Sequence, residues 1–177
     1  FRRGSKSRVG LIYDNVLTPS EWAFIRKEAE HHNRPGRFVA ISAYERTCPE
    51  NEAGRVDVGK PTLGGPRGSQ NHRIVLFPEN EGPLYHFTEP DTNTPGKWVS
   101  AINQTDAFIF PHHATWRAMP GERFGGAEVC SCWDIYIQMR DTIPGHLRQG
   151  HRFALMGNSD SHRIVPGSGG ALTGVWA

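Results

Sequence analysis

The sequence predicts an α/β fold with a largely parallel sheet, on two observations. First, apolar segments typical of buried strands alternate with amphipathic segments typical of helices along the 177 residues. Second, several apolar segments are followed directly by carboxylate and imidazole side chains. Parallel sheets carry their catalytic and binding residues at the carboxyl ends of the strands, so this pattern favours such a sheet. The length suits a single domain with a substantial core.

The first element is a helix with a clear start signal. Thr18 is a suitable N-cap, Pro19 occupies the first helical position, and Glu21 completes a capping box. Pro35 and Gly36 end this helix, which spans residues 18–33. Strands are expected at 37–45, 72–77, 106–113, 127–133, 152–157 and 171–177, and short helices at 97–103 and 144–149. Long Gly- and Pro-rich loops cover 47–70 and 78–96.

Composition limits the partners of the chain. It has 20 basic and 18 acidic residues, a balance that provides no bulk attraction to nucleic acid or to a membrane surface. No apolar run reaches membrane-spanning length, so a soluble protein is expected. The cysteines Cys48, Cys130 and Cys132 fit no disulfide framework, and as free thiols they are compatible with a cytoplasmic or an exported protein.

Potential metal ligands stand at the ends of three predicted strands. Glu45 ends one strand, His112 and His113 end another, and Asp160 and His162 follow a third. The carboxyl ends of neighbouring parallel strands meet at one rim, so these side chains are expected to converge. Glu, His and Asp together suit Zn, Mn or Fe. Taken singly, each has a structural alternative, such as a capping role for Glu45.

Other polar residues are harder to place at this rim. His72 begins its strand, so in a parallel sheet it belongs at the opposite rim unless a local bulge or an antiparallel turn intervenes. Glu128 opens its strand, while His146 and His151 flank a helix end, and we interpret these three as structural or solvated residues.

A family resemblance adds to these observations. The segments "NRPGRFVAISAYERT", "NHRIVLF", "FIFPHH" and "HRFALMGNSDSHRIVPGSGGALTGVWA" occur in the order, and close to the wording, of the PHP (polymerase and histidinol phosphatase) superfamily. They are most similar to its branch of bacterial proteins of unknown function. The resemblance runs from about Leu17 to the C-terminus, matches residues 1–16 poorly, and indicates one PHP-like domain over 1–177.

The resemblance implies a distorted TIM-like (β/α) barrel with long loops, and two or three divalent ions (Zn, Mn or Fe) at its C-terminal rim. It implies hydrolysis of a small anionic substrate, most often a phosphoester. The metal ligands that it implies are Glu45, His72, His112, Asp160 and His162. Glu45 would bridge the ions and act in catalysis, with His113 as a competing ligand. In a completed site His113, if not a ligand, would be the general acid, and Arg163 and Arg117 are candidates for gripping the substrate, with solvated surface charge as the alternative interpretation of each arginine.

One departure from the superfamily pattern matters. The His-x-His and Asp-His motifs of its first strands are missing before Leu17, so we expect the chain to be the C-terminal part of a longer protein. A missing N-terminal segment or an oligomer partner would then cover an exposed sheet edge. The complete protein would be an enzyme, whereas this part alone would be short of ligands. Alternatives are a non-catalytic or incomplete PHP-like binding module, and an amidohydrolase-like enzyme.

Overall fold

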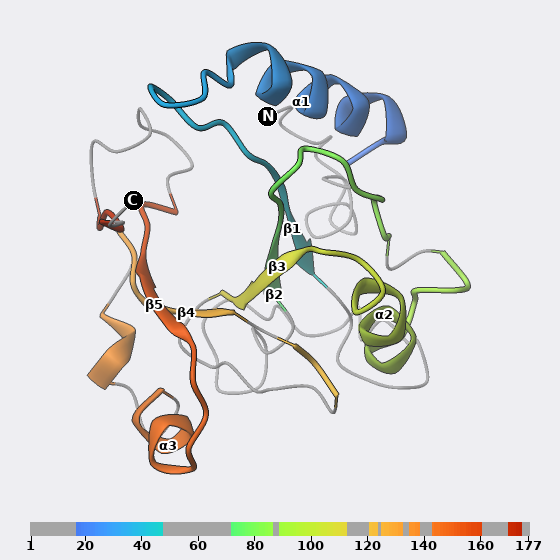
Figure 1. Cartoon of the computed structure of the whole chain (residues 1–177). Helices are drawn as coiled ribbons and strands as arrows, with labels where there is room; N and C mark the ends of the chain where they lie inside the picture. The colour runs from blue at the N-terminus through green and yellow to red at the C-terminus, as the bar shows by residue number, and fades with distance from the viewer. Residues whose placement is uncertain are drawn as a thin grey trace, which may run out of the picture.

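The protein has a mixed α and β architecture, seen in a computed structural model (Figure 1). The structure describes residues 17–47, 72–86, 89–112, 121–123, 125–132, 135–138, 143–160 and 170–174. Its elements are α1 (Pro19–His32), β1 (Ser42–Thr47), β2 (His72–Phe77), α2 (Pro95–Ile102), β3 (Phe108–Pro111), β4 (Gly126–Cys130), the 3₁₀ helix η1 (Tyr136–Gln138), α3 (Ile143–Arg148) and β5 (Ala154–Gly157).

The strand directions differ from the largely parallel sheet that the sequence predicts. β1, β2 and β3 form an antiparallel sheet in that order, and only β4 and β5 pair in parallel. The prediction of parallel strands is therefore wrong for the first three. An apolar pattern predicts where a strand lies in the sequence. It does not predict whether the next connection crosses over to give a parallel strand or turns back to give an antiparallel one.

The two sheets adjoin through Gly125. Its amide donates a hydrogen bond to the carbonyl of Ile109 in β3 (2.9 Å), and its carbonyl accepts one from the amide of Ala154 in β5 (2.8 Å). A Cβ atom at residue 125 would collide with the Phe108 ring, so the close approach requires glycine. β4 and β5 thus continue the layer begun by β1–β3 (Figure 1). The described residues form no closed barrel.

The capping box predicted for the first helix is confirmed. The Thr18 hydroxyl accepts a hydrogen bond from the Glu21 amide (3.2 Å), and the Glu21 carboxylate accepts one from the Thr18 amide (2.9 Å). Both bonds satisfy amides that have no partner within the helix. α1 therefore begins at a defined residue and presents Trp22 to the sheet.

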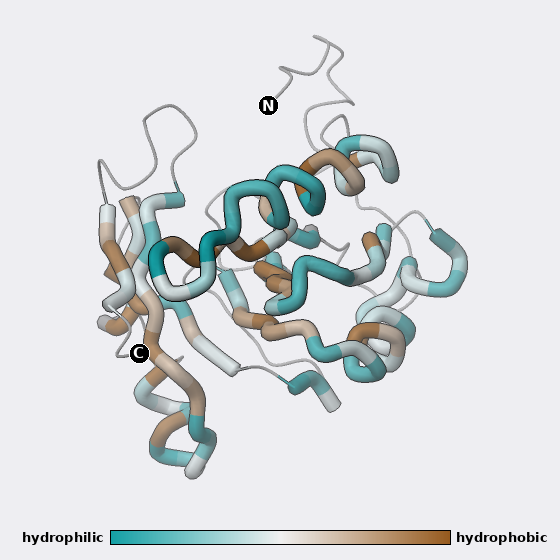
Figure 2. Tube along the Cα trace, turned by 45° about the horizontal axis from the view of Figure 1, so that its top comes forward, coloured by the Kyte–Doolittle hydropathy of each residue, from teal (hydrophilic) through white to brown (hydrophobic). Residues whose placement is uncertain are grey.

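The hydrophobic core lies on one face of the antiparallel sheet. Both α1 and α2 pack there, and their indoles enter a cluster with side chains of all three strands: Trp22, Tyr44, Val75, Phe77, Trp98, Val99, Ile102 and Ile109. Trp98 and Phe77 are fully buried. Figure 2 shows hydrophobic strand segments beneath a mostly hydrophilic α1. The opposite sheet face is thus left for other side chains.

Two predicted strands differ more from the structure than the others do. The strand expected at 37–45 begins only at Ser42, because Arg34 and Phe38 exchange two backbone hydrogen bonds around a turn that contains Gly36 at φ 77°. The strand expected at 171–177 is wrong for 171–174, where the Thr173 hydroxyl bonds the amide and carbonyl of Gly157 in place of a strand ladder. Residues 175–177 lie outside the described residues.

The structure also bears on the cysteines and on membrane association. Cys130 and Cys132 are free thiols, as predicted, whereas Cys48 lies outside the described residues. Within the described ranges, every helix is too short or too polar to cross a membrane.

Candidate functional site

Three of the predicted ligands share the sheet face opposite the core. In the antiparallel register Glu45 pairs with Ile74 and Thr47 with His72, which places Glu45 and His72 on the same face. The His112 amide donates to the His72 carbonyl (3.1 Å), and the β2–β3 register places these two histidines opposite each other. Cross-strand neighbours project their side chains together.

Antiparallel pairing resolves the position of His72. The exception allowed for an antiparallel connection applies, because the start of β2 lies beside the end of β1. The Nδ1 atom of His72 lies 2.6 Å from Oε1 of Glu45, so the two form an ion pair or a short hydrogen bond. Both side chains retain access to solvent.

His112 lies at the centre of a buried group of carboxylates. Its Nδ1 atom lies 2.7 Å from Oε2 of Glu128 in β4, and its Nε2 atom lies 3.5 Å from Oδ1 of Asp160, which follows β5. The side chains of His112 and Glu128 are 3% and 0% exposed, so this contact is shielded from water. We refer to Glu45, His72, His112, Glu128 and Asp160 as the strand-end cluster.

Asp160 is held in place by backbone contacts. Its φ of 41° lies in the left-handed region, which Asp tolerates better than most residues. The preceding residues hydrogen-bond to the β4 end of the sheet, since the Cys132 amide donates to the Ser159 carbonyl (3.2 Å) and the Asn158 amide to the Cys130 carbonyl (3.2 Å). The loop therefore aims the carboxylate at His112.

The electrostatic surroundings determine the charge of His112. Burial disfavours the imidazolium, but the carboxylates of Asp160 and Glu128 outweigh burial, and with a smaller contribution from Glu45 they raise the pKa of His112 to about 10. His112 is therefore protonated at neutral pH when no cation is bound. The influence of Glu45 on His112 reflects their shared place in the cluster.

This pKa predicts a pH dependence of stability. Because the folded protein holds the His112 proton more tightly than the unfolded chain, the stabilisation is complete below the ordinary value of 6.5 and is lost as the pH rises toward 10. In EDTA, the free energy of unfolding should fall in this window with a slope of up to about 1.4 kcal/mol per pH unit. Urea unfolding between pH 6.5 and 9.5 measures the slope.

The variant His112→Gln tests whether His112 causes this pH dependence. It should lose most of the slope of unfolding free energy against pH. His31→Gln, at an exposed position on α1, serves as the matched control and should keep it. Equal slopes for all three proteins would contradict the assignment of the proton to His112.

His113, His162, Arg117 and Arg163 lie outside the described residues, so their roles stay predictions. Conversely, Glu128 belongs to the cluster although the sequence interpretation made it structural. Glu128 is buried in the middle of β4, and a carboxylate within an otherwise apolar segment was the available signal.

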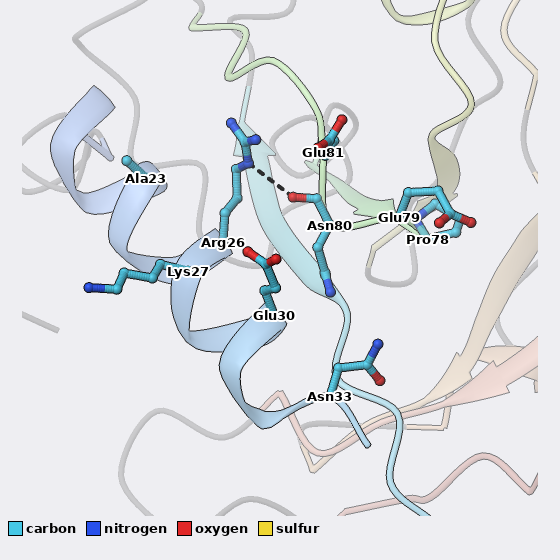
Figure 3. Close-up of a pocket in the computed structure, with 9 residues that line it drawn as sticks. All are labelled: Ala23, Arg26, Lys27, Glu30, Asn33, Pro78, Glu79, Asn80 and Glu81. Carbon is cyan, nitrogen blue, oxygen red and sulfur yellow. Dashed lines mark hydrogen bonds between the residues drawn. The ribbon is translucent and has the colours of Figure 1, made fainter. Parts of the chain in front are cut away.

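A pocket of about 360 Å³ lies elsewhere, between α1 and the turn that follows β2 (Figure 3). This turn is at the opposite end of β2 from His72. Arg26 donates a hydrogen bond to the Asn80 carbonyl across the pocket (3.0 Å), and the Asn80 side chain bonds the backbone of Ser42 and Ala40. These contacts join α1, the turn and β1, which gives the lining a structural role.

The donor chemistry of the strand-end cluster suits a divalent metal ion in part. With metal–ligand bonds of about 2.1 Å, two ligand atoms on one ion lie roughly 3.0–3.4 Å apart. The 3.5 Å between His112 Nε2 and Asp160 Oδ1 is close to this spacing, and Glu128 at Nδ1 is the usual outer partner of a metal-binding histidine. Among the described residues, no group of three or more His, Cys, Asp or Glu side chains is arranged to hold an ion.

No protein-family model, curated protein or solved structure matches this chain.

Proposed function

We propose that the chain carries part of the metal centre of a metal-dependent hydrolase of the PHP type that cleaves phosphoester bonds. The observation that carries the proposal is His112, held between Glu128 and Asp160 beside the sheet face that also bears Glu45 and His72. Buried carboxylates around one imidazole are costly to desolvate, and such groups are frequent at functional sites.

The proposal assigns a role to each residue of the cluster. His112 and Asp160 would hold one divalent ion (Zn, Mn or Fe), with Glu45 and His72 available to a second, and His162 is expected to complete the set. Glu128 would keep the Nε2 atom of His112 directed at Asp160. Bound ions would activate a water molecule and polarise the substrate oxygen.

The proposed substrate is a small anion, and the proposed fold is part of a distorted TIM-like barrel. The continuity of β3 with β4 and β5 through Gly125 supports the barrel proposal, as does the resemblance of the strand-end motifs to those of the superfamily. Arg117, Arg163 and the general acid His113 would complete the substrate side of the site.

The test is the Mn²⁺ affinity of this chain, together with metal-dependent hydrolysis by the full-length protein, each compared with one variant. The chain is loaded with Mn²⁺ or Zn²⁺, and p-nitrophenyl phosphate hydrolysis and Mn²⁺ affinity by calorimetry are measured. Asp160→Asn keeps size and suits the positive φ, but it removes the charge that a cation needs, so affinity and hydrolysis should both fall at least tenfold.

His31→Gln, on the exposed surface of α1, is the control and should leave both quantities unchanged. Metal binding that Asp160→Asn does not weaken would contradict the proposed centre. Metal binding at this centre without hydrolysis of any phosphoester would favour the binding module.

A further inference from the structure

Two histidines outside the strand-end cluster lie against each other at the end of α3. The ring centroids of His146 and His151 are 5.2 Å apart, and the ring planes cross at 70°. His146 belongs to the last turn of α3 and is half-buried, while His151 follows the helix and is exposed. The proposed hydrolase uses neither residue.

The backbone brings the two imidazoles together. Gly150 adopts a φ of 86°, its amide donates to the Leu147 carbonyl (3.0 Å), and the His151 amide donates back to the His146 carbonyl (3.1 Å). This is the usual glycine-dependent end of a helix, and it folds the residue after glycine back onto the last turn. The pair is thus positioned by the main chain, which reduces the entropy lost when both rings bind one ligand.

The ring separation suits joint coordination of a metal ion. An imidazole nitrogen lies about 2.0–2.1 Å from zinc, and the ring centre lies about 1.1 Å farther along the same line, so two rings on a tetrahedral ion have centres about 5 Å apart. The observed 5.2 Å agrees with this value. Joint coordination further requires one nitrogen of each ring to face the same point.

The electrostatics of the pair also favour a cation of this kind. Partial burial, together with the neighbouring His151, lowers the pKa of His146, so its ring is neutral and able to act as a ligand near neutral pH. The carbonyl groups at the C-terminal end of α3 attract positive charge. The guanidinium groups of Arg148 and Arg152 oppose binding, but both residues are exposed and screened by salt.

We propose that His146 and His151 form a two-imidazole binding site for a divalent transition-metal ion, separate from the strand-end cluster. Imidazole nitrogens select Ni²⁺, Cu²⁺ and Zn²⁺ over Mg²⁺ and Ca²⁺, which require oxygen ligands. This site is independent of the proposed hydrolase and would exist even if that proposal failed.

The experiment titrates the full chain with Ni²⁺, which unlike Cu²⁺ does not oxidise the free thiols. Calorimetry at pH 7.5 follows the wild type, His146→Gln, His151→Gln and the double variant. One Ni²⁺ site should weaken at least tenfold in each single variant and disappear in the double variant. His112→Gln should retain it, which separates this site from the strand-end cluster.

The matched control is His31→Gln. His31 and His32 are also neighbouring histidines, with ring centroids 4.9 Å apart, but they follow one another on an exposed helix surface. Ni²⁺ binding that falls equally in His31→Gln and in the double variant would mean non-specific surface binding and would overturn the proposal. Unchanged binding in the double variant would overturn it as well.

Discussion

Replacing Glu122 by glutamine is expected to lower the free energy of unfolding by about 3–5 kcal/mol. Glu122 pairs with Arg73 of β2 through two contacts, of which the one between Nη2 and Oε2 measures 3.0 Å. The two side chains are 1% and 0% exposed, so the variant leaves a buried guanidinium without its carboxylate. Urea unfolding at neutral pH measures the loss.

Two further variants test whether the loss comes from the buried ion pair. Glu89→Gln removes a carboxylate from the exposed surface and should change stability by less than about 0.5 kcal/mol. The double variant Arg73→Met/Glu122→Leu removes both charges and should regain a large part of the loss. A small effect of Glu122→Gln would show that water or another group replaces the carboxylate.

Replacing Glu128 by glutamine is expected to reduce metal affinity at the strand-end cluster, and any metal-dependent hydrolysis, by about 10- to 100-fold. Glu128 does not face the proposed ion, since its carboxylate lies 2.7 Å from Nδ1 on the other side of the His112 ring. It acts by holding the ring and making Nε2 a better ligand. Mn²⁺ calorimetry and p-nitrophenyl phosphate hydrolysis measure the loss.

If Glu128 positions His112, its replacement should also change the pH dependence of stability. Without the Glu128 carboxylate the pKa of His112 should fall, so the loss of stability with rising pH should still begin near 6.5 but should end at a lower pH, and be smaller in total, than in the wild type. Glu30→Gln, at an exposed position on α1, should leave affinity and pH dependence unchanged. Full metal affinity in Glu128→Gln would contradict the role.

The sequence predicted correctly those helices and strands whose formation depends on residues close to one another in the chain. Thr18, Pro19 and Glu21 predicted the start of α1 because a capping box uses only contacts within one helical turn. The alternating burial of β2 matches the strand predicted at the same residues, since period and polarity are local properties. Candidate ligands at strand ends could be named for the same reason.

The sequence by itself thus determined the existence and approximate place of most helices and strands, and it pointed to Glu45, His112 and Asp160. The tertiary structure decided the direction of β1, β2 and β3, and with it the approach of His72 to Glu45. It also decided that Glu128 contacts His112 from the following strand, β4. Pairing partners and strand direction depend on contacts between distant segments, and no local pattern of residue types records which segments will meet.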